Sequence, residues 1–163
     1  MASTTKQNYE QTTYGGGLAQ MIGAARQIIG DAVATRTLLA DESGALCLFD
    51  RAAGVVYTLP APVIGMQFEF ATTVTITSNA AKVITSAATE FILGDVQIIL
   101  VGAATTLAAA GNGSTHRAIS SNGSTTGGVI GDRYRLTAIS TTQWLVDGVI
   151  SGTGTLATPF ATS

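Results

Sequence analysis

Hydrophobic and polar positions alternate with a period of two along residues 67–77. One parity carries Phe68, Phe70, Val74 and Ile76, and the other carries Gln, Glu and Thr. Because successive side chains of a β-strand point to opposite faces, the pattern predicts a strand with one buried and one solvated face. Thr suits the solvated face, since its branched Cβ fits a pleated sheet. We expect the four apolar side chains to be buried.

Short apolar or alternating runs of strand length continue through the chain from residue 35. Segments rich in Gly, Pro, Asn and Ser separate them, as turns would. The other predicted strands are 36–39, 46–49, 55–59, 83–86, 96–101, 116–120, 133–137 and 143–146. Many short strands with frequent turns are typical of a sandwich or a barrel. The predicted fold class is therefore all-β, a small antiparallel, jelly-roll-like sandwich or barrel.

Two Asn-Gly pairs, Asn112-Gly113 and Asn122-Gly123, are the strongest turn signals. This dipeptide readily adopts the positive φ angles of a tight hairpin turn. Both pairs continue as Asn-Gly-Ser-Thr. We interpret them as two successive hairpin ends on one sheet and not as a solenoid repeat, because nothing else recurs at that period.

Composition divides the chain into three segments. They are an N-terminal arm with one short helix at 1–34, a β domain at 35–150, and a C-terminal extension at 151–163. The last segment is rich in Gly, Thr and Ala, which predicts an arm or an extension at a sheet edge.

The N-terminal segment begins with a polar stretch. Residues 1–17 have Tyr9 and Tyr14 as their only large rings and end in three glycines, which predicts an extended arm and a hinge. Apolar residues then recur at three- and four-residue steps over 18–34, which predicts the short helix, and Gly30 would end it.

Charge is scarce in this sequence. Charged residues make up 11% of the chain and the formal net charge is -2, against a typical charged fraction of ~25%. A surface built from Thr, Ser, Gly and Asn has little electrostatic protection against association, so we expect a protein that lies against other proteins. The alternative is a monomer with a hydroxyl-rich surface. The 8 Lys and Arg residues do not cluster, which argues against nucleic acid as a partner.

No segment is typical of export or of membrane insertion. The polar start of the chain, with Lys6 and Glu10, does not have the pattern of a signal peptide. The longest uncharged stretch, 96–115, is broken by polar residues and glycines, and its continuous apolar part is only 98–101. A membrane span needs ~20 predominantly apolar residues, so no membrane association is predicted.

The sequence offers few candidates for catalysis or metal binding. The single cysteine, Cys47, lies in an apolar run and is predicted to be buried. The single histidine, His116, could act as the base of a hydrolase triad, but the sequence has no G-x-S-x-G motif for the nucleophile. We therefore expect His116 to lie at a surface or an interface. One Cys and one His exclude an ordinary structural zinc site. Trp144 alternates with a polar neighbour and is predicted to pack in the core. We predict a protein that is not an enzyme and has no cofactor or metal.

Four segments, taken in order, resemble small virion proteins encoded near the major capsid gene of tailed phages and prophages. We identify these as head decoration, or cement, proteins, and the resemblance covers about residues 36–163. The segments are Leu59-Pro60-Ala61-Pro62 with Gly65 and Phe68; Thr75-Ile76-Thr77-Ser78-Asn79; Gly113-Ser114-Thr115-His116-Arg117-Ala118-Ile119-Ser120; and Thr142-Gln143-Trp144-Leu145-Val146 with the ending Ala157-Thr158-Pro159-Phe160.

The resemblance implies a structural protein that binds the outside of the expanded phage capsid and stabilises it. It implies the major capsid protein as partner, a homotrimer, and a location on the outer surface of a virion assembled in the bacterial cytoplasm. No small-molecule ligand is expected. The candidate capsid contacts are the two rings of the arm and the polar residues at the turns: Tyr9, Tyr14, Asn112, His116, Arg117 and Asn122.

Two other functions compete with this interpretation. A tail-fibre or receptor-binding β domain would also be rich in strands, Thr and Gly, but it would need an exposed carbohydrate platform and fibre repeats. A small glycan-active enzyme would need a pair of carboxylates that faces a groove, and such a pair meets only in the folded chain.

Overall fold

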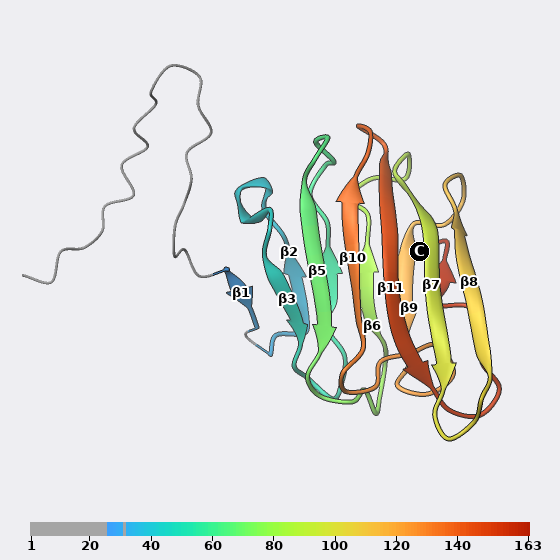
Figure 1. Ribbon diagram of the computed structural model, residues 1–163. Coiled ribbons are helices and arrows are strands. Elements are labelled where there is room, and N and C mark those ends of the chain that lie inside the picture. The colour runs from blue at the N-terminus through green and yellow to red at the C-terminus, as the bar shows by residue number, and fades with distance from the viewer. Residues whose placement is uncertain (1–25, 31) are drawn as a thin grey trace, which may run out of the picture.

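The computed structural model describes residues 26–30 and 32–163, and this part of the chain is nearly all strand (Figure 1). Its one helix is a 3₁₀ turn, η1, at Ala40–Glu42. The strands are β1 (Ile28–Ile29), β2 (Thr35–Thr37), β3 (Leu46–Phe49), β4 (Val56–Thr58), β5 (Gln67–Thr72), β6 (Ala81–Ile84), β7 (Phe91–Leu100), β8 (Thr106–Asn112), β9 (Ala118–Ser121), β10 (Arg133–Ala138), β11 (Gln143–Gly152) and β12 (Phe160–Ala161). The prediction of an all-β protein is confirmed.

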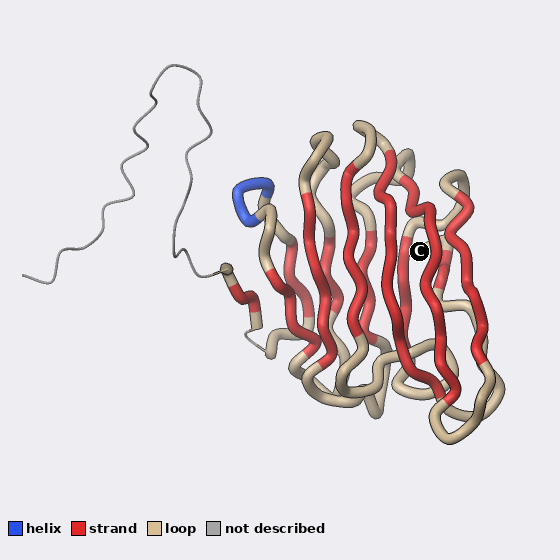
Figure 2. Tube along the Cα trace, in the orientation of Figure 1, coloured by secondary structure: helices blue, strands red, loops and turns tan. Residues whose placement is uncertain are grey.

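The strands form two mixed sheets that lie one behind the other (Figures 1 and 2). Sheet A has seven strands in the order β1-β3-β5-β10-β11-β7-β8, and sheet B has five in the order β12-β9-β6-β4-β2. The expectation of purely antiparallel sheets is wrong. The parallel pairs are β1 with β3, β3 with β5, β2 with β4, β4 with β6, and β7 with β11.

The four parallel pairs among β1 to β6 arise because the chain crosses between the sheets after each of these strands. β1, β3 and β5 enter sheet A, whereas β2, β4 and β6 enter sheet B. A chain that alternates between two layers returns to each layer in the same direction, so neighbours within a layer are parallel. The antiparallel prediction assumed that consecutive strands form hairpins, which holds for β7 with β8 and for β10 with β11.

Aromatic side chains from both sheets meet in the core. Tyr57 of sheet B lies 5.5 Å from the ring of Phe49 and 5.6 Å from that of Phe70, both in sheet A. Its hydroxyl donates to the carbonyl of Leu48 at 2.8 Å, so the polar end of the ring is satisfied. Trp144 is fully buried, which confirms its predicted place in the core.

The alternation over 67–77 is confirmed in its first half only. Phe68, Phe70 and Ile76 are buried, but Val74 is 38% exposed, so its predicted burial is wrong. The reason is that β5 ends at residue 72. The backbone N–H groups of Thr73 and Val74 both donate to the carbonyl of Phe49, which bends the chain and interrupts the period of two.

The helix predicted over 18–34 is wrong where the structure describes the chain. Ile28 and Ile29 form strand β1, with Ile28 63% exposed and Ile29 buried. The N–H of Leu46 donates to the carbonyl of Gln27 at 2.9 Å, so pairing with β3 decides the conformation here. The rest of that prediction, and the arm at 1–17 with Tyr9 and Tyr14, lie outside the described residues.

Candidate functional site

The outer face of sheet A carries a row of residues aligned by strand register. Sheet A buries one parity of its strands against the core, so the other parity points away from the molecule. Register aligns one such residue from each of six neighbouring strands. This charged row is Leu46, Glu69, Arg135, Asp147, Asp95 and Ala110.

Two ion pairs involve members of the charged row. Arg135 pairs with Asp147 at 3.3 Å, and Arg26 pairs with Glu69. The Arg135 and Asp147 side chains are 52% and 63% exposed. Exposed pairs of this kind contribute ~0–1 kcal/mol to stability.

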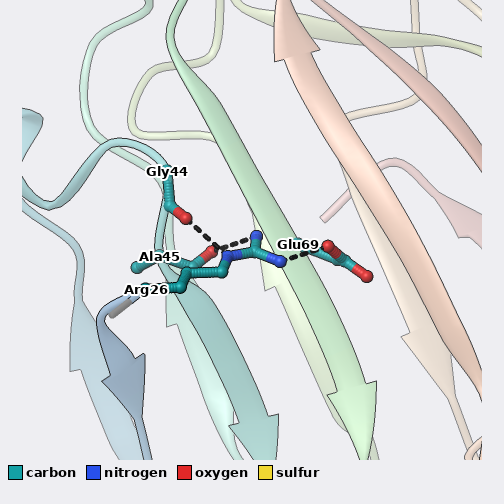
Figure 3. A network of polar contacts seen from close by, with 4 residues as sticks. All are labelled: Arg26, Gly44, Ala45 and Glu69. Carbon is teal, nitrogen blue, oxygen red and sulfur yellow. Dashed lines mark hydrogen bonds and ion pairs between the residues drawn. The ribbon is translucent and has the colours of Figure 1, made fainter. Parts of the chain in front are cut away.

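Arg26 fastens the chain where it enters sheet A (Figure 3). Its Nε donates to the carbonyl of Gly44 at 2.7 Å, and its Nη2 donates to that of Ala45 at 3.0 Å. The remaining arm of the guanidinium binds the carboxylate of Glu69. The planar fork of arginine can serve three acceptors at once, which an ammonium group cannot do in the same geometry.

A shallow hollow of about 390 Å³ lies over β10 and β11. Its lining residues are Glu69, Arg133, Tyr134, Arg135, Asp147, Gly148 and Val149. Guanidinium and carboxylate groups therefore surround it, with one aliphatic side chain beside them. In the described part of the chain, no group of three or more His, Cys, Asp or Glu is placed to hold a metal ion.

Gly148 and Tyr134, which both line this hollow, lie directly opposite each other on β11 and β10. A Cβ at residue 148 would lie 2.4 Å from the Cβ of Tyr134 on the neighbouring strand. Tyr134 is 5% exposed, and burial raises the pKa of its phenol well above the ordinary value. The ring is thus a packing element, stacked 5.4 Å from Phe70, and not an acid or base at physiological pH.

Half-exposed aliphatic side chains flank the charged row on the same face. Leu145 and Val149 are 39% and 47% exposed on β11, and Ile99 is 43% exposed on β7. By register Leu145 faces Leu93, and Val149 faces Gln97. The outer face of sheet A is therefore a mixture of paired charges, aliphatic groups and small residues.

The Asn112 side chain organises the loop after β8. Its Oδ1 accepts the backbone N–H groups of Ser114, Thr115 and His116, and its Nδ2 donates to the Thr115 hydroxyl at 2.7 Å. Nδ1 of His116 accepts the N–H of Asn112 at 3.2 Å. Gly113 has φ +68°, which is the positive value expected of the Asn-Gly pair.

The loop at Asn122 repeats this arrangement. Oδ1 of Asn122 accepts the N–H groups of Ser124 and Thr126, and Nδ2 donates to the Thr125 hydroxyl at 2.9 Å. The Thr126 hydroxyl accepts the N–H of Asn122, as the imidazole does in the first loop. The same four-residue sequence therefore forms the same local cap twice.

The interpretation of these loops as hairpin ends on one sheet is wrong. The loop after β8 leads from sheet A to β9 in sheet B, and the loop after β9 leads back to β10 in sheet A. A side chain that caps its own loop does not require the flanking strands to pair with each other.

The two loops also lie at opposite ends of the molecule. Gln143, at the start of β11, donates to the carbonyl of Gly113, whereas Thr153, just past its end, donates to that of Ser124. The strand between them has 10 residues, or roughly 30 Å. Asn112 and Asn122 therefore cannot belong to one compact site.

His116 and Arg117 lie together with Asn112. The His116 ring stacks on Phe160 with centroids 5.6 Å apart. Nε of Arg117 donates to the carbonyl of Ala87 at 3.1 Å. Both side chains are half-buried in contacts within the chain, which leaves less of each for a partner than the sequence suggested.

Sequence reasoning missed the outer face of sheet A. In the predicted strand 133–137, Arg133 and Arg135 alternate with Tyr134 and Leu136, which indicates that both arginines lie on a solvated face. The alignment of Arg135 with Glu69 depends on the pairing of β10 with β5, which are distant in sequence, and no local pattern encodes it.

Cys47 is inert in its setting. It is fully buried, as predicted, and burial raises the pKa of its thiol to about 12. A thiol that stays protonated is a poor nucleophile and a poor metal ligand.

Comparison of this chain with family models, with curated proteins and with solved structures finds no match. Among the described residues, no helix has the length and apolar character that a membrane crossing requires.

Proposed function

We propose that this protein is a decoration, or cement, protein that binds the outside of the expanded capsid of a tailed phage and stabilises it. The observation that carries the proposal is the outer face of sheet A, where ion-paired charges, half-exposed aliphatic side chains and small residues are interleaved over seven strands. The sequence resemblance points the same way.

The chemistry of this face suits a protein partner better than a small ligand. Small-molecule sites are enclosed and mostly apolar, whereas the hollow beside Arg135 and Asp147 is shallow and lined by exposed charges. Protein interfaces are about as apolar as the rest of the surface and surround their contacts with polar groups. Leu145 and Val149 would supply the apolar contact, and the charged row would set the orientation.

A partner that binds one state of a shell stabilises that state. If the protein binds the expanded capsid and not its precursor, the free energy of binding adds to the stability of the expanded form. Many copies on one particle act together, so each contact with the major capsid protein can be modest. The proposal places homotrimers on the outer surface of the virion, without nucleic acid, membrane or enzymatic activity.

The finer architecture is part of the proposal. We treat the two layers as a small β-sandwich that turns the outer face of sheet A toward the shell. Residues 1–17, with Tyr9 and Tyr14, would act as an arm that reaches a neighbouring capsid subunit. Arg26 would hold the base of that arm in place, since it binds Gly44, Ala45 and Glu69.

Co-sedimentation with expanded capsids stripped of the protein tests the proposal. The double variant Leu145→Glu/Val149→Glu places two negative charges in the proposed apolar contact, which should weaken binding at least about tenfold. The matched control is Val63→Glu/Ile64→Glu, which changes two equally aliphatic side chains, 60% and 69% exposed, in the loop before β5.

The control variant should bind as the wild type does. Equal binding by all three proteins would contradict the assignment of this face. If the wild type binds no capsid but binds a glycan on an array, the tail-fibre interpretation replaces the proposal.

A further inference from the structure

Strand β8 is an edge of sheet A that lacks the usual protection. Within the described residues the four sheet edges are β1, β2, β12 and β8, and the first three have 2, 3 and 2 residues, against 7 in β8. Exposed edges normally carry charges or proline that prevent pairing with another chain. No charged residue and no proline occurs between Val101 and Thr115.

The hydrogen bonds at the two ends of the β7–β8 ladder fix which groups of β8 face outward. The N–H of Leu100 donates to Thr105, and the N–H of Gly113 donates to Ile92. Bonded pairs alternate along an antiparallel ladder. With the observed register, the backbone groups of Leu107, Ala109 and Gly111 therefore face β7, and those of Thr106, Ala108 and Ala110 face away.

A hydrogen bond in the loop after β8 independently confirms which backbone groups of β8 face away from β7. The N–H of Asn112 has the outward parity, and it donates to Nδ1 of His116 instead of to another strand. The open part of the edge is consequently Thr106 to Ala110, and its middle residue is Ala108.

We propose that β8 pairs with β8 of a second copy, antiparallel, around a two-fold axis at Ala108. In that register Thr106 faces the partner's Ala110, and Ala108 faces its own equivalent. Every open N–H and C=O between Thr106 and Ala110 then has a partner. Outward residues meet outward residues, so the two outer faces of sheet A continue into each other on the same side.

A second copy of β8 is the partner that best suits the open edge of β8. The pairing brings no charges together, and the side chains that meet at its centre are alanines, so two sheets can approach without a clash. It also requires a partner edge of equal length, which β8 alone supplies among the edges of residues 26–30 and 32–163. The contact is two-fold, so it is separate from the threefold contact of the proposed trimer and does not depend on it.

A single engineered cysteine tests the pairing. Residues that exchange hydrogen bonds across an antiparallel pair have Cα atoms ~5.5 Å apart, within the range of a disulfide. Ala108→Cys should therefore form an intermolecular disulfide under mild oxidation, at least about tenfold faster than a cysteine at a position outside the contact. Cys47 does not compete for disulfide formation, because its side chain is fully buried and its thiol pKa is about 12.

The matched control is Gln97→Cys, which is exposed on the same outer face and directly opposite Ala108, one strand in from the edge. Adding Ala110→Pro to Ala108→Cys should abolish the disulfide, because it removes an outward N–H that the β7 ladder does not use. An unchanged melting temperature shows that this variant is folded.

Equal oxidation rates at 97 and 108 would overturn the proposal. So would a disulfide that forms only in Ala108→Cys lacking residues 1–25, because the N-terminal segment and not a second β8 would then cover the edge in the full chain. Since both experiments use the isolated protein, failure of the β8 pairing is distinguishable from failure to bind a capsid.

Discussion

Oδ1 of Asp132 accepts the backbone N–H of Ser151 at 2.7 Å, which ties the loop before β10 to the end of β11. Its other oxygen accepts the N–H groups of Gly128 and Val129 at 2.8 and 3.0 Å. Three donors on one buried carboxylate hold the chain where it returns from sheet B to sheet A.

Stability should depend on the protonation of Asp132. Burial raises the pKa of this carboxyl above its ordinary value of 3.8, and the three backbone donors oppose the rise only in part. The folded state therefore binds the proton more tightly than the unfolded state. Between the ordinary pKa and the raised one, this group's contribution to the free energy of unfolding falls as pH rises.

Urea denaturation of wild type and Asp132→Asn from pH 4 upward measures this contribution. The variant cannot ionise at residue 132, so the difference in unfolding free energy between wild type and variant should shift against the wild type as pH rises. A difference that stays constant over the whole range would contradict the raised pKa.

Phe70→Ala should destabilise the protein by roughly 3–5 kcal/mol, because it removes a fully buried ring between Tyr57 and Tyr134. Val74→Ala, two positions beyond the end of the same strand, should cost no more than about 0.5 kcal/mol, since Val74 is 38% exposed. Thermal or urea melts compare the two. Similar losses would mean that the alternation of residues 67–77 continues past Thr72 after all.

Gly148→Ala should destabilise the fold although it adds a single methyl group. The new Cβ would lie 2.4 Å from the Cβ and 2.5 Å from the Cα of Tyr134, and backbone shifts of this kind cost about 1–3 kcal/mol. Val149→Ala, on the next residue and 47% exposed, is the control. A melting temperature of Gly148→Ala equal to that of the control would show that β10 and β11 separate freely.

Arg26→Lys should lose most of the stabilisation that Arg26 provides. Lysine keeps the charge but cannot bind Gly44, Ala45 and Glu69 in the same fork geometry. We expect a loss of about 1 kcal/mol for both Arg26→Lys and Arg26→Ala. Arg135→Ala, which breaks one exposed pair, should cost at most about 0.5 kcal/mol. Full rescue by lysine would show that charge alone matters at residue 26.

The sequence pattern predicted the features that depend on neighbouring residues alone, namely where strands begin, which side chains are buried and which glycines have positive φ. Strands β3, β5 and β10 begin at the residues predicted for them, and Cys47 and Trp144 are buried as their neighbours along the chain indicated. The Asn-Gly pairs have glycines with positive φ, because the preference belongs to the dipeptide itself.

The sheet to which each strand belongs could not be predicted from the sequence. β3 and β4 are consecutive and similar in length, yet they lie in different layers because the connection between them passes from one sheet to the other. The spacings in sequence between aligned residues of parallel neighbours, such as Ile28, Leu46 and Glu69, are unequal. The sequence therefore contains no regular repeat that would reveal the alternation between the two sheets. The charged row depends on the same non-local register, which is why the predicted contacts were placed in the loops instead.

A cryo-EM map of the parent phage particle tests the central claim most directly. The account predicts density for residues 26–163 on the outside of the expanded shell, with the outer face of sheet A, including Leu145 and Val149, against the major capsid protein. Density for the chain on a tail fibre, or on the shell with sheet B facing inward and sheet A free in solvent, would contradict it.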